Sequence, residues 1–202
     1  MKTISCGKKS KGELTKDKIL VEAARLMHKK GFEATTINDL LKATGLKKGC
    51  LYFHFSGKDE LSLAVLQKAR AEFFAFMDSL FEGKTPGDRL NNLFKGLQDA
   101  QRDMGFSGGC IFGNTALEMG DKDENLSAFV RGVFDEITEK VQKVVKAAQV
   151  AGQIRKDVSA GILARHIVMT IEGGIMLTRL EKSEKPLKDC VDSLRTLIGL
   201  KK

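Results

Sequence analysis

A short run of basic and aromatic residues in the first third of the chain carries groups that bind nucleic acid. Lys47 and Lys48 begin this run, Gly49 follows, and Tyr52 and His54 come about one helical turn later. Lysine ammonium groups reach phosphate oxygens or the edges of guanine bases, and a glycine lets the backbone approach a groove closely. The tyrosine hydroxyl and the histidine imidazole can donate hydrogen bonds to phosphate oxygens. This combination predicts a surface that contacts duplex DNA.

Two short helices have to position these side chains. The spacing of apolar residues predicts one helix that Thr35 or Thr36 opens and Gly45 ends, and a second helix over Lys47–Phe53. Gly45 supplies the positive φ of the tight turn between them, and Thr36 can offer its hydroxyl and a backbone N–H to a phosphate. The pair matches a helix-turn-helix, whose second helix lies in the major groove. Three apolar side chains are expected to pack inward and hold that second helix: Leu51, Phe53 and Phe55.

The positive charge of the chain is concentrated near its start. The 202 residues contain 34 Lys and Arg against 26 Asp and Glu, a net charge of +8. Residues 1–60 hold 13 of the basic and 7 of the acidic residues, so the rest of the chain is nearly neutral. A basic segment of this kind suits a polyanion, either nucleic acid or an anionic membrane surface. The leader with Lys2, Lys8, Lys9 and Lys11 is either a solubilising tail or an arm that touches the DNA backbone.

Apolar residues recur at helical spacing along almost the whole chain, and no stretch favours a β-strand. The sequence therefore predicts an all-α fold of about nine helices, with an N-terminal three-helix helix-turn-helix domain and a larger helical domain. Thr15 is expected to cap the first helix, and a long fourth helix is expected to start within residues 56–60. The later helices are expected over Asp88–Met104, Cys110–Glu118, Glu124–Ala151, Ser159–Lys182 and Pro186–Gly199.

Three segments follow from this organisation. A basic flexible arm is expected over residues 1–14, the DNA-binding domain over 15–62 and the larger domain over 63–202. The boundary between the two domains is expected inside the long fourth helix, which would link the basic domain to the nearly neutral one.

Composition argues against several classes of protein. No apolar run approaches 18 residues and no secretory signal is evident, so a cytoplasmic location without membrane association is expected. The four cysteines have no CxxC spacing, and neither a metal nor another cofactor is expected. An acid/base enzyme built around His166 and Glu172 has little support, because the chain lacks a metal-ligand cluster, a nucleophile elbow and a phosphate loop. A basic helical adaptor for a membrane surface or a protein is the other alternative.

The run Gly45–Phe55, followed by Lys58-Asp59-Glu60-Leu61, resembles the signature of the tetracycline-repressor (TetR) family of transcriptional regulators. Upstream, Gly31–Ile37 with Asp39-Leu40 matches the same signature, and the resemblance covers about residues 15–65. It implies a further phosphate contact at Lys58. The family usually has a hydroxyl side chain where this chain has Lys47 and Cys50. Lys47 therefore adds a charge in place of an N-cap, and the contact that a hydroxyl would make at Cys50 stays open.

The resemblance also implies that residues from about 66 onward bind a small molecule and dimerise, so that ligand binding releases the DNA. Pocket residues are expected on the inner faces of the fourth to eighth helices. Large apolar groups there suit an apolar or aromatic effector, although the same stripes are also typical of a plain core. The predicted ligand residues are Phe73, Phe76, Met77, Phe94, Met104, Phe106, Cys110, Phe112, His166 and Met169.

Cys110 supports an alternative form of regulation. Gly108 and Gly109 precede it at the start of a predicted helix, where nearby backbone N–H groups would lower the pKa of its thiol. The segment Gly109–Glu118 is similar to a subgroup of the family that includes electrophile-sensing repressors. A repressor that responds to electrophiles or oxidants through Cys110 is therefore the alternative function, and a packing role for Cys110 is the other interpretation.

The last two helices are expected to form the interface of a homodimer. The predicted contact is a stripe in which Gly173 and Gly174 permit close approach of helices. A symmetric dimer presents two recognition helices and therefore requires an approximately palindromic operator. Burial of this apolar helix inside one subunit is the alternative. The stripe consists of Ile167, Ile171, Gly174, Ile175 and Thr178.

Overall fold

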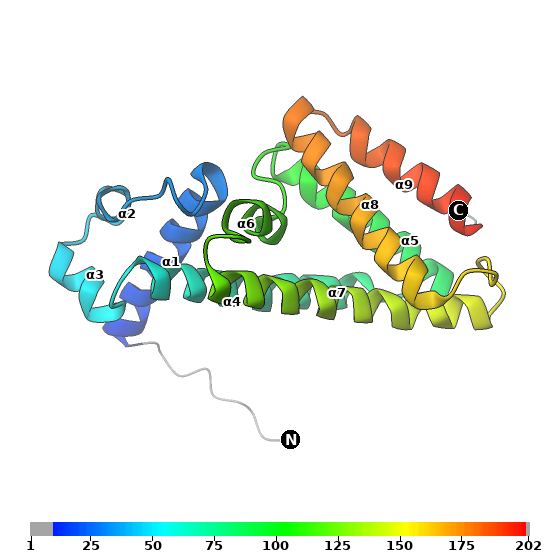
Figure 1. The fold of residues 1–202 in the computed structure, drawn as a ribbon, viewed down its shortest axis with the longest axis horizontal. Helices are drawn as coiled ribbons and strands as arrows, with labels where there is room; N and C mark the ends of the chain where they lie inside the picture. The colour runs from blue at the N-terminus through cyan, green and yellow to red at the C-terminus, as the bar shows by residue number, and fades with distance from the viewer. Residues whose placement is uncertain (1–9, 201–202) are drawn as a thin grey trace, which may run out of the picture. The chain divides into compact units, whose positions relative to one another are not determined.

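The computed structural model describes residues 10–200, and this part of the chain is entirely helical apart from its connecting loops (Figure 1). The prediction of an all-α fold is confirmed. Most helix ends follow local signals in the sequence, because capping side chains and left-handed glycines satisfy the free backbone groups at the ends. The helices are α1 (Lys11–Lys30), α2 (Ile37–Thr44), α3 (Lys48–His54), α4 (Lys58–Leu80), α5 (Pro86–Asp103), α6 (Ile111–Met119), α7 (Glu124–Val150), α8 (Ala160–Glu181) and α9 (Lys185–Ile198).

The chain divides into two compact units, and the division falls inside α4. The first unit ends at Ala69 and contains α1, α2, α3 and the first half of α4. The second unit begins at Arg70 and contains the rest of α4 together with α5 to α9. Each unit has its own buried apolar core, which is the property that defines a domain.

The first helix begins earlier than the sequence predicts. Ser10, and not Thr15, is the N-cap of α1: its hydroxyl accepts a hydrogen bond from the backbone N–H of Glu13, and the Glu13 carboxylate accepts one from the Ser10 N–H. This reciprocal capping box outweighs the signal at Thr15, whose hydroxyl donates to the Lys11 carbonyl inside the helix. Lys11 therefore belongs to α1. The other lysines of the predicted arm, Lys2, Lys8 and Lys9, lie outside the described residues.

The second unit is organised around α8, which packs against α7 on one side and α9 on the other. Figure 1 shows α9 lying alongside α8. Gly174 permits this close approach, because a methyl group at its Cα would lie 3.1 Å from both Cys190 Sγ and Leu187 Cδ1. The absence of a long apolar run predicts no membrane span. Judged by length and composition alone, however, the 22-residue α8 could cross a membrane, since an 18-residue window in it has a mean hydropathy of 1.3. The buried stripe of α8 packs in the protein core, and core helices pass the same test.

Candidate functional site

The turn between α2 and α3 has the geometry of a helix-turn-helix. Gly45 ends α2 in the left-handed region, with φ 68° and ψ 15°, and its N–H donates to the Leu41 carbonyl. Other residues adopt this conformation only with strain, so a glycine is needed at this position. As predicted, Thr36 is the N-cap of α2. The turn thus joins two short helices at the place that the sequence indicated.

Thr36 and Asp39 form a capping box that fixes the start of α2. The Thr36 hydroxyl accepts a hydrogen bond from the Asp39 N–H at 3.1 Å and lies 2.9 Å from Asp39 Oδ2, to which it donates. The hydrogen bonds from Thr36, with the ammonium of Lys30 at 3.1 Å, lower the pKa of Asp39 to about 2. Both donors of Thr36, its hydroxyl and its backbone N–H, are therefore engaged with Asp39, and the predicted contact with a phosphate falls to the free backbone N–H groups in the first turn of α2.

The exposed face of α3 carries the cations and the aromatic ring that the sequence singled out. Lys47 is the N-cap residue and, as predicted, makes no side-chain capping bond. Lys48 is exposed, and its ammonium lies 5.7 Å from the centroid of the Tyr52 ring, which is itself partly exposed. A methyl group at Gly49 would meet no atom within 4 Å, so the backbone there is open to a large partner. Cys50 is half-buried on the same short helix.

Two buried side chains anchor α3, and a third does not. Leu51 and Phe55 are buried, as predicted. Phe53 is not: its side chain is 83% exposed, and the expectation that it packs inward is wrong. Its ring meets the ring of His54 edge to face, at 5.2 Å between centroids. In a helix of seven residues the positions 51 and 55 already fill the inner face, so residue 53 points to the other side.

Lys58, at the start of α4, also belongs to the basic surface of the first unit. Its ammonium donates to the Glu33 carbonyl at 2.7 Å, which ties the start of α4 to the loop before α2. An ammonium group has three donors, so this bond leaves two for a phosphate. The described surface around α3 thus offers lysine ammonium groups, a phenol, an imidazole and an exposed apolar ring. Phosphates, base edges and thymine methyl groups are contacted by groups of this kind.

In the second unit, several of the predicted ligand residues pack against one another. Phe112 lies on α6 and meets the ring of Phe73 on α4 at 5.9 Å between centroids. Met77, Phe94 and Phe112 are almost fully buried, and Phe73, Phe76 and Phe106 are half-buried. The expectation of an inward position is wrong for three others, because their side chains are exposed: Met104, His166 and Met169.

Cys110 is placed at the start of α6, as predicted, but its thiol has the opposite electrostatics. Cys110 is the N-cap residue, and its sulfur accepts a hydrogen bond from the Gly113 N–H at 3.4 Å. Burial raises the pKa of this thiol well above its usual range, and the adjacent Glu172 carboxyl raises it further. The predicted lowering of the pKa is therefore wrong. A raised pKa favours the neutral thiol of this half-buried residue over the nucleophilic thiolate that an electrophile sensor needs.

Glu172 reaches the start of α6 from the middle of α8. A methyl group at Gly113 would lie 2.5 Å from Glu172 Oε2, so the carboxyl group would have to shift if residue 113 carried a side chain. Burial raises the pKa of Glu172, and the hydrogen bond with Cys110 acts in the opposite direction. The pair of Cys110 and Glu172 is thus a buried polar contact between α6 and α8.

Glu172→Gln is expected to raise the melting temperature at pH 7.5, and this gain is expected to disappear as the pH falls toward 4.5. The raised pKa means that the folded state binds the proton more tightly than the unfolded chain, whose value is near 4.5. The contribution of the protonated Glu172 to the free energy of unfolding is therefore fully present below that pH and is lost as the pH rises through the folded-state pKa. Glutamine does not titrate, so the variant has no such dependence. Thermal unfolding at the two pH values measures the difference, with Glu139→Gln as the exposed control. An equal effect of Glu172→Gln at both pH values would contradict this assignment.

The stripe that was predicted to face a partner subunit is buried inside this one. Ile167, Ile171, Gly174, Ile175 and Thr178 all point into the subunit, so the alternative of burial within the monomer is correct for these residues. A different face of α8 and α9 is exposed and apolar, and we call it the α8/α9 face. Its large apolar residues are Ile162, Met169, Met176, Leu177 and Leu180 on α8 and Leu197 on α9.

These features define a class of protein, since a capped helix-turn-helix with exposed cations on its second helix is the architecture of a DNA-binding regulator. Comparison with known families gives the same class. A model of the bacterial regulatory proteins of the tetR family matches residues 19–65, and a model of the tetracyclin repressor-like C-terminal domain matches residues 86–194. The chain belongs to the TetR family of transcriptional regulators, whose members are transcription factors and not enzymes.

Individual relatives support this assignment along most of the chain. The transcriptional regulator AcuR of Cereibacter sphaeroides is 28% identical over 160 residues, 78% of this chain and 73% of AcuR. The repressor DhaR of a Mycobacterium species is 23% identical over 171 residues, 84% of each chain. A crystal structure of a TetR transcriptional regulator from Chloroflexus aurantiacus superposes with a TM-score of 0.85 and 32% identity, over 94% of this chain and 96% of that one.

Proposed function

We propose that this regulator is a repressor that binds a palindromic operator as a homodimer and leaves it when a small molecule binds the second unit. The observation that carries the proposal is the exposed face of α3. Lys48, Tyr52 and Phe53 are all exposed on this short helix, which places a cation beside two large aromatic side chains at the surface. In this arrangement α3 is the helix that enters the major groove.

We assign the contacts with DNA by position. Lys47 and Lys48 bind phosphates or guanine edges at the start of α3, and Gly49 lets the groove wall come close to the backbone. Tyr52 and Phe53 contribute a hydroxyl and an apolar ring that suits a thymine methyl group. Four further residues are proposed at the edges of the contact: Thr36, Cys50, His54 and Lys58.

The homodimer is proposed to form through the α8/α9 face. Gly173 lies on α8 in open space, since a methyl group there would meet no atom within 4 Å, so a partner helix could approach closely. Gly174, one residue further on, is already in contact with α9 of the same subunit. An exposed stripe of large apolar side chains is unusual on a monomeric protein and is typical of an interface.

We place this regulator in the cytoplasm, with duplex DNA, a second copy of itself and a small molecule as its partners. Chemical control through Cys110 is not the form of regulation that we propose, because its half-buried thiol lies beside the Glu172 carboxyl and its pKa is raised. Reversible binding of a ligand to residues 70–202 requires no thiolate.

Selection of random duplexes on the purified protein tests the proposed function. The expected result is an inverted repeat, because two-fold symmetric dimers read two identical half-sites in opposite directions. Binding to that duplex is expected to fall steeply with salt concentration, as counterions compete for the phosphates. Enrichment of no common sequence, or tight binding to anionic vesicles without preference for any duplex, would favour the adaptor hypothesis and reject the repressor.

A further inference from the structure

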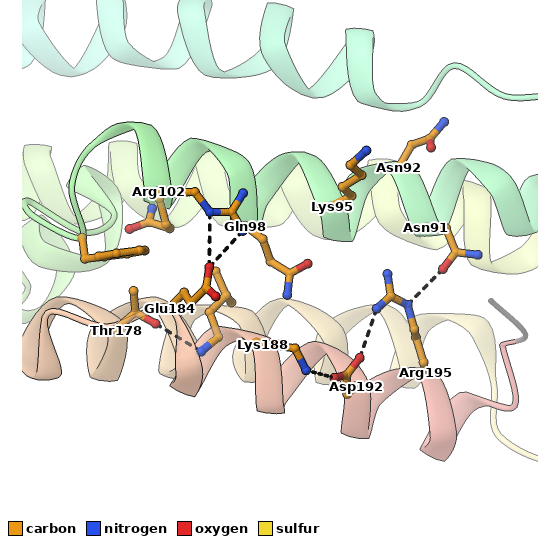
Figure 2. Close-up of a pocket in the computed structure, with 13 residues that line it drawn as sticks. Asn91, Asn92, Lys95, Gln98, Arg102, Thr178, Glu184, Lys188, Asp192 and Arg195 are labelled. Atoms are coloured by element: carbon orange, nitrogen blue, oxygen red, sulfur yellow. Dashed lines mark hydrogen bonds and ion pairs between the residues drawn. The ribbon is translucent and has the colours of Figure 1, made fainter.

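A polar groove separates α5 from α9 in the second unit, at a place that the predicted ligand residues do not cover, apart from Phe106 at one edge. Figure 2 shows the two helices running side by side with polar side chains between them. The groove has a volume of about 520 Å³, within the range of sites for small molecules. Most of the residues that line this groove are polar, and several of them are exposed to solvent.

Polar contacts between the two helices lie at both ends of the groove. Arg102 on α5 donates to the Glu184 carboxylate before α9 at 2.9 Å. Arg195 on α9 donates to Asn91 Oδ1 on α5 at 3.0 Å. Both contacts are drawn as dashed lines in Figure 2. Because the first pair joins the end of α5 to the start of α9 and the second joins the opposite ends, the helices are antiparallel, and a polar contact spans the groove at each end.

Between these two contacts, three polar side chains of α5 have no hydrogen-bond partner within residues 10–200. They are Lys95, Gln98 and Gln101, which line the groove at successive turns of the helix. In Figure 2 the Gln98 amide points from α5 toward α9, and Lys95 lies at the rim with its ammonium turned outward. An exposed lysine can swing over the rim at little cost. The groove therefore presents donors and acceptors that the protein itself does not satisfy.

Gln101 is the strongest of these observations. Its side chain is only 5% exposed, and its oxygen is buried without a hydrogen bond in the part of the chain that the structure describes. Buried polar atoms are nearly always satisfied, so this unpaired acceptor, on a residue that lines the groove, indicates a donor that reaches it once the side chain rotates. A hydroxyl group on a bound molecule is such a donor.

The charged residues of the groove indicate which other chemical group the ligand carries. Four cationic side chains line it, against the two carboxylates of Glu184 and Asp192. Lys188 is 2.8 Å from Asp192, and Arg102 and Arg195 are also paired, so the free cation among the lining residues is Lys95. An anionic group next to Lys95 and the Gln98 amide, with a hydroxyl toward Gln101, matches all three unsatisfied side chains.

We propose that the groove between α5 and α9 binds a hydroxylated organic acid. The carboxylate accepts hydrogen bonds from Lys95 and from the Gln98 amide, and the hydroxyl donates to Gln101 after a small rotation of that side chain. All three contacts come from α5, and the ligand lies beside α9, which packs against α8 and carries part of the α8/α9 face. Binding itself is independent of DNA, whereas a role of this ligand as the effector rests on the proposed function.

Calorimetric titration of the full chain, without DNA, tests the proposal with two probes that differ only in a hydroxyl group. Citrate is expected to bind with a dissociation constant of about 1 mM or lower, and tricarballylate, which lacks the hydroxyl, at least 10-fold more weakly. Lys95→Ala and Gln98→Ala are each expected to weaken citrate binding at least 5-fold. Lys146→Ala removes an exposed charge from α7 and is expected to have no effect.

Three results would overturn the site. They are the absence of saturable citrate binding up to 10 mM at constant ionic strength, equal affinity for the two probes, and binding that neither α5 variant changes. Gln101→Leu adds a further readout, since it fills the position without an acceptor and is expected to abolish the preference for citrate over tricarballylate. A failure of operator binding would leave these titrations unaffected, so the site and the repressor function are tested separately.

Discussion

Lys48→Ala is expected to weaken operator binding by about 1–3 kcal/mol for each half-site, or about 5- to 150-fold, if the lysine contacts a base. The side chain is exposed at the start of α3, from which it would reach base edges if this helix entered the major groove as proposed. Among residues 10–200 its ammonium forms no ion pair and lies near the Tyr52 ring, so its removal is expected to leave the fold intact. A dimer carries one Lys48 in each subunit, so on a palindromic duplex the loss of binding free energy occurs at both half-sites. Fluorescence anisotropy with the selected operator measures it.

The matched control for this prediction is Lys146→Ala, which removes an equal charge from the exposed side of α7. It is expected to retain wild-type affinity. Circular dichroism and the melting temperature of both variants establish that they are folded. If Lys48→Ala binds the operator as tightly as the wild type, α3 is not the recognition helix and the assignment of its residues fails.

Met176→Glu is expected to dissociate the homodimer, with an increase in the dimer dissociation constant of roughly 100-fold or more. Met176 lies in the middle of the apolar stripe on α8 and is exposed in the single subunit. A dimer through the α8/α9 face would bury the new carboxylate without a cation to pair with it, and an unpaired buried charge costs several kcal/mol. Sedimentation velocity over a range of concentrations measures the effect.

Leu117→Glu is the control for this variant, because Leu117 is a large apolar residue that is also exposed but lies on α6. It is expected to leave the dimer unchanged. Since a monomer contacts only one half-site, Met176→Glu is also expected to lose most of its affinity for the palindrome. A dimer of unchanged stability in Met176→Glu would place the interface on another surface.

The parts of this structure that the sequence predicts well are those that local contacts determine. The helix-turn-helix is one of them: Thr36 caps α2 with Asp39 three residues away, and Gly45 ends the same helix in a conformation that only glycine adopts readily. These capping and glycine signals lie within ten residues of the helix ends that they determine. The order and type of the later helices follow from their long apolar periodicity in the same way.

The wrong predictions arise where one helix is apolar on more than one side, or where residues far apart in the sequence come into contact. α8 is apolar around much of its surface, so periodicity alone does not distinguish Ile171, which is buried, from Met169, which is exposed. Phe53 belongs to a helix too short for its inner face to be read from spacing. The pKa of Cys110 depends on burial and on Glu172, which comes 62 residues later in the chain. The groove between α5 and α9 likewise joins residues far apart in sequence, such as Asn91 and Arg195.

The affinity of the wild-type protein for its selected operator, compared with a scrambled duplex of the same length and composition, tests the central claim most directly. A sequence-specific regulator is expected to prefer the operator by about 1,000-fold or more near physiological salt. Both affinities are expected to fall as salt rises, because phosphate contacts contribute to each. Equal affinity for the two duplexes at every salt concentration would show that the basic face of α3 binds polyanions without reading sequence, and would contradict the account.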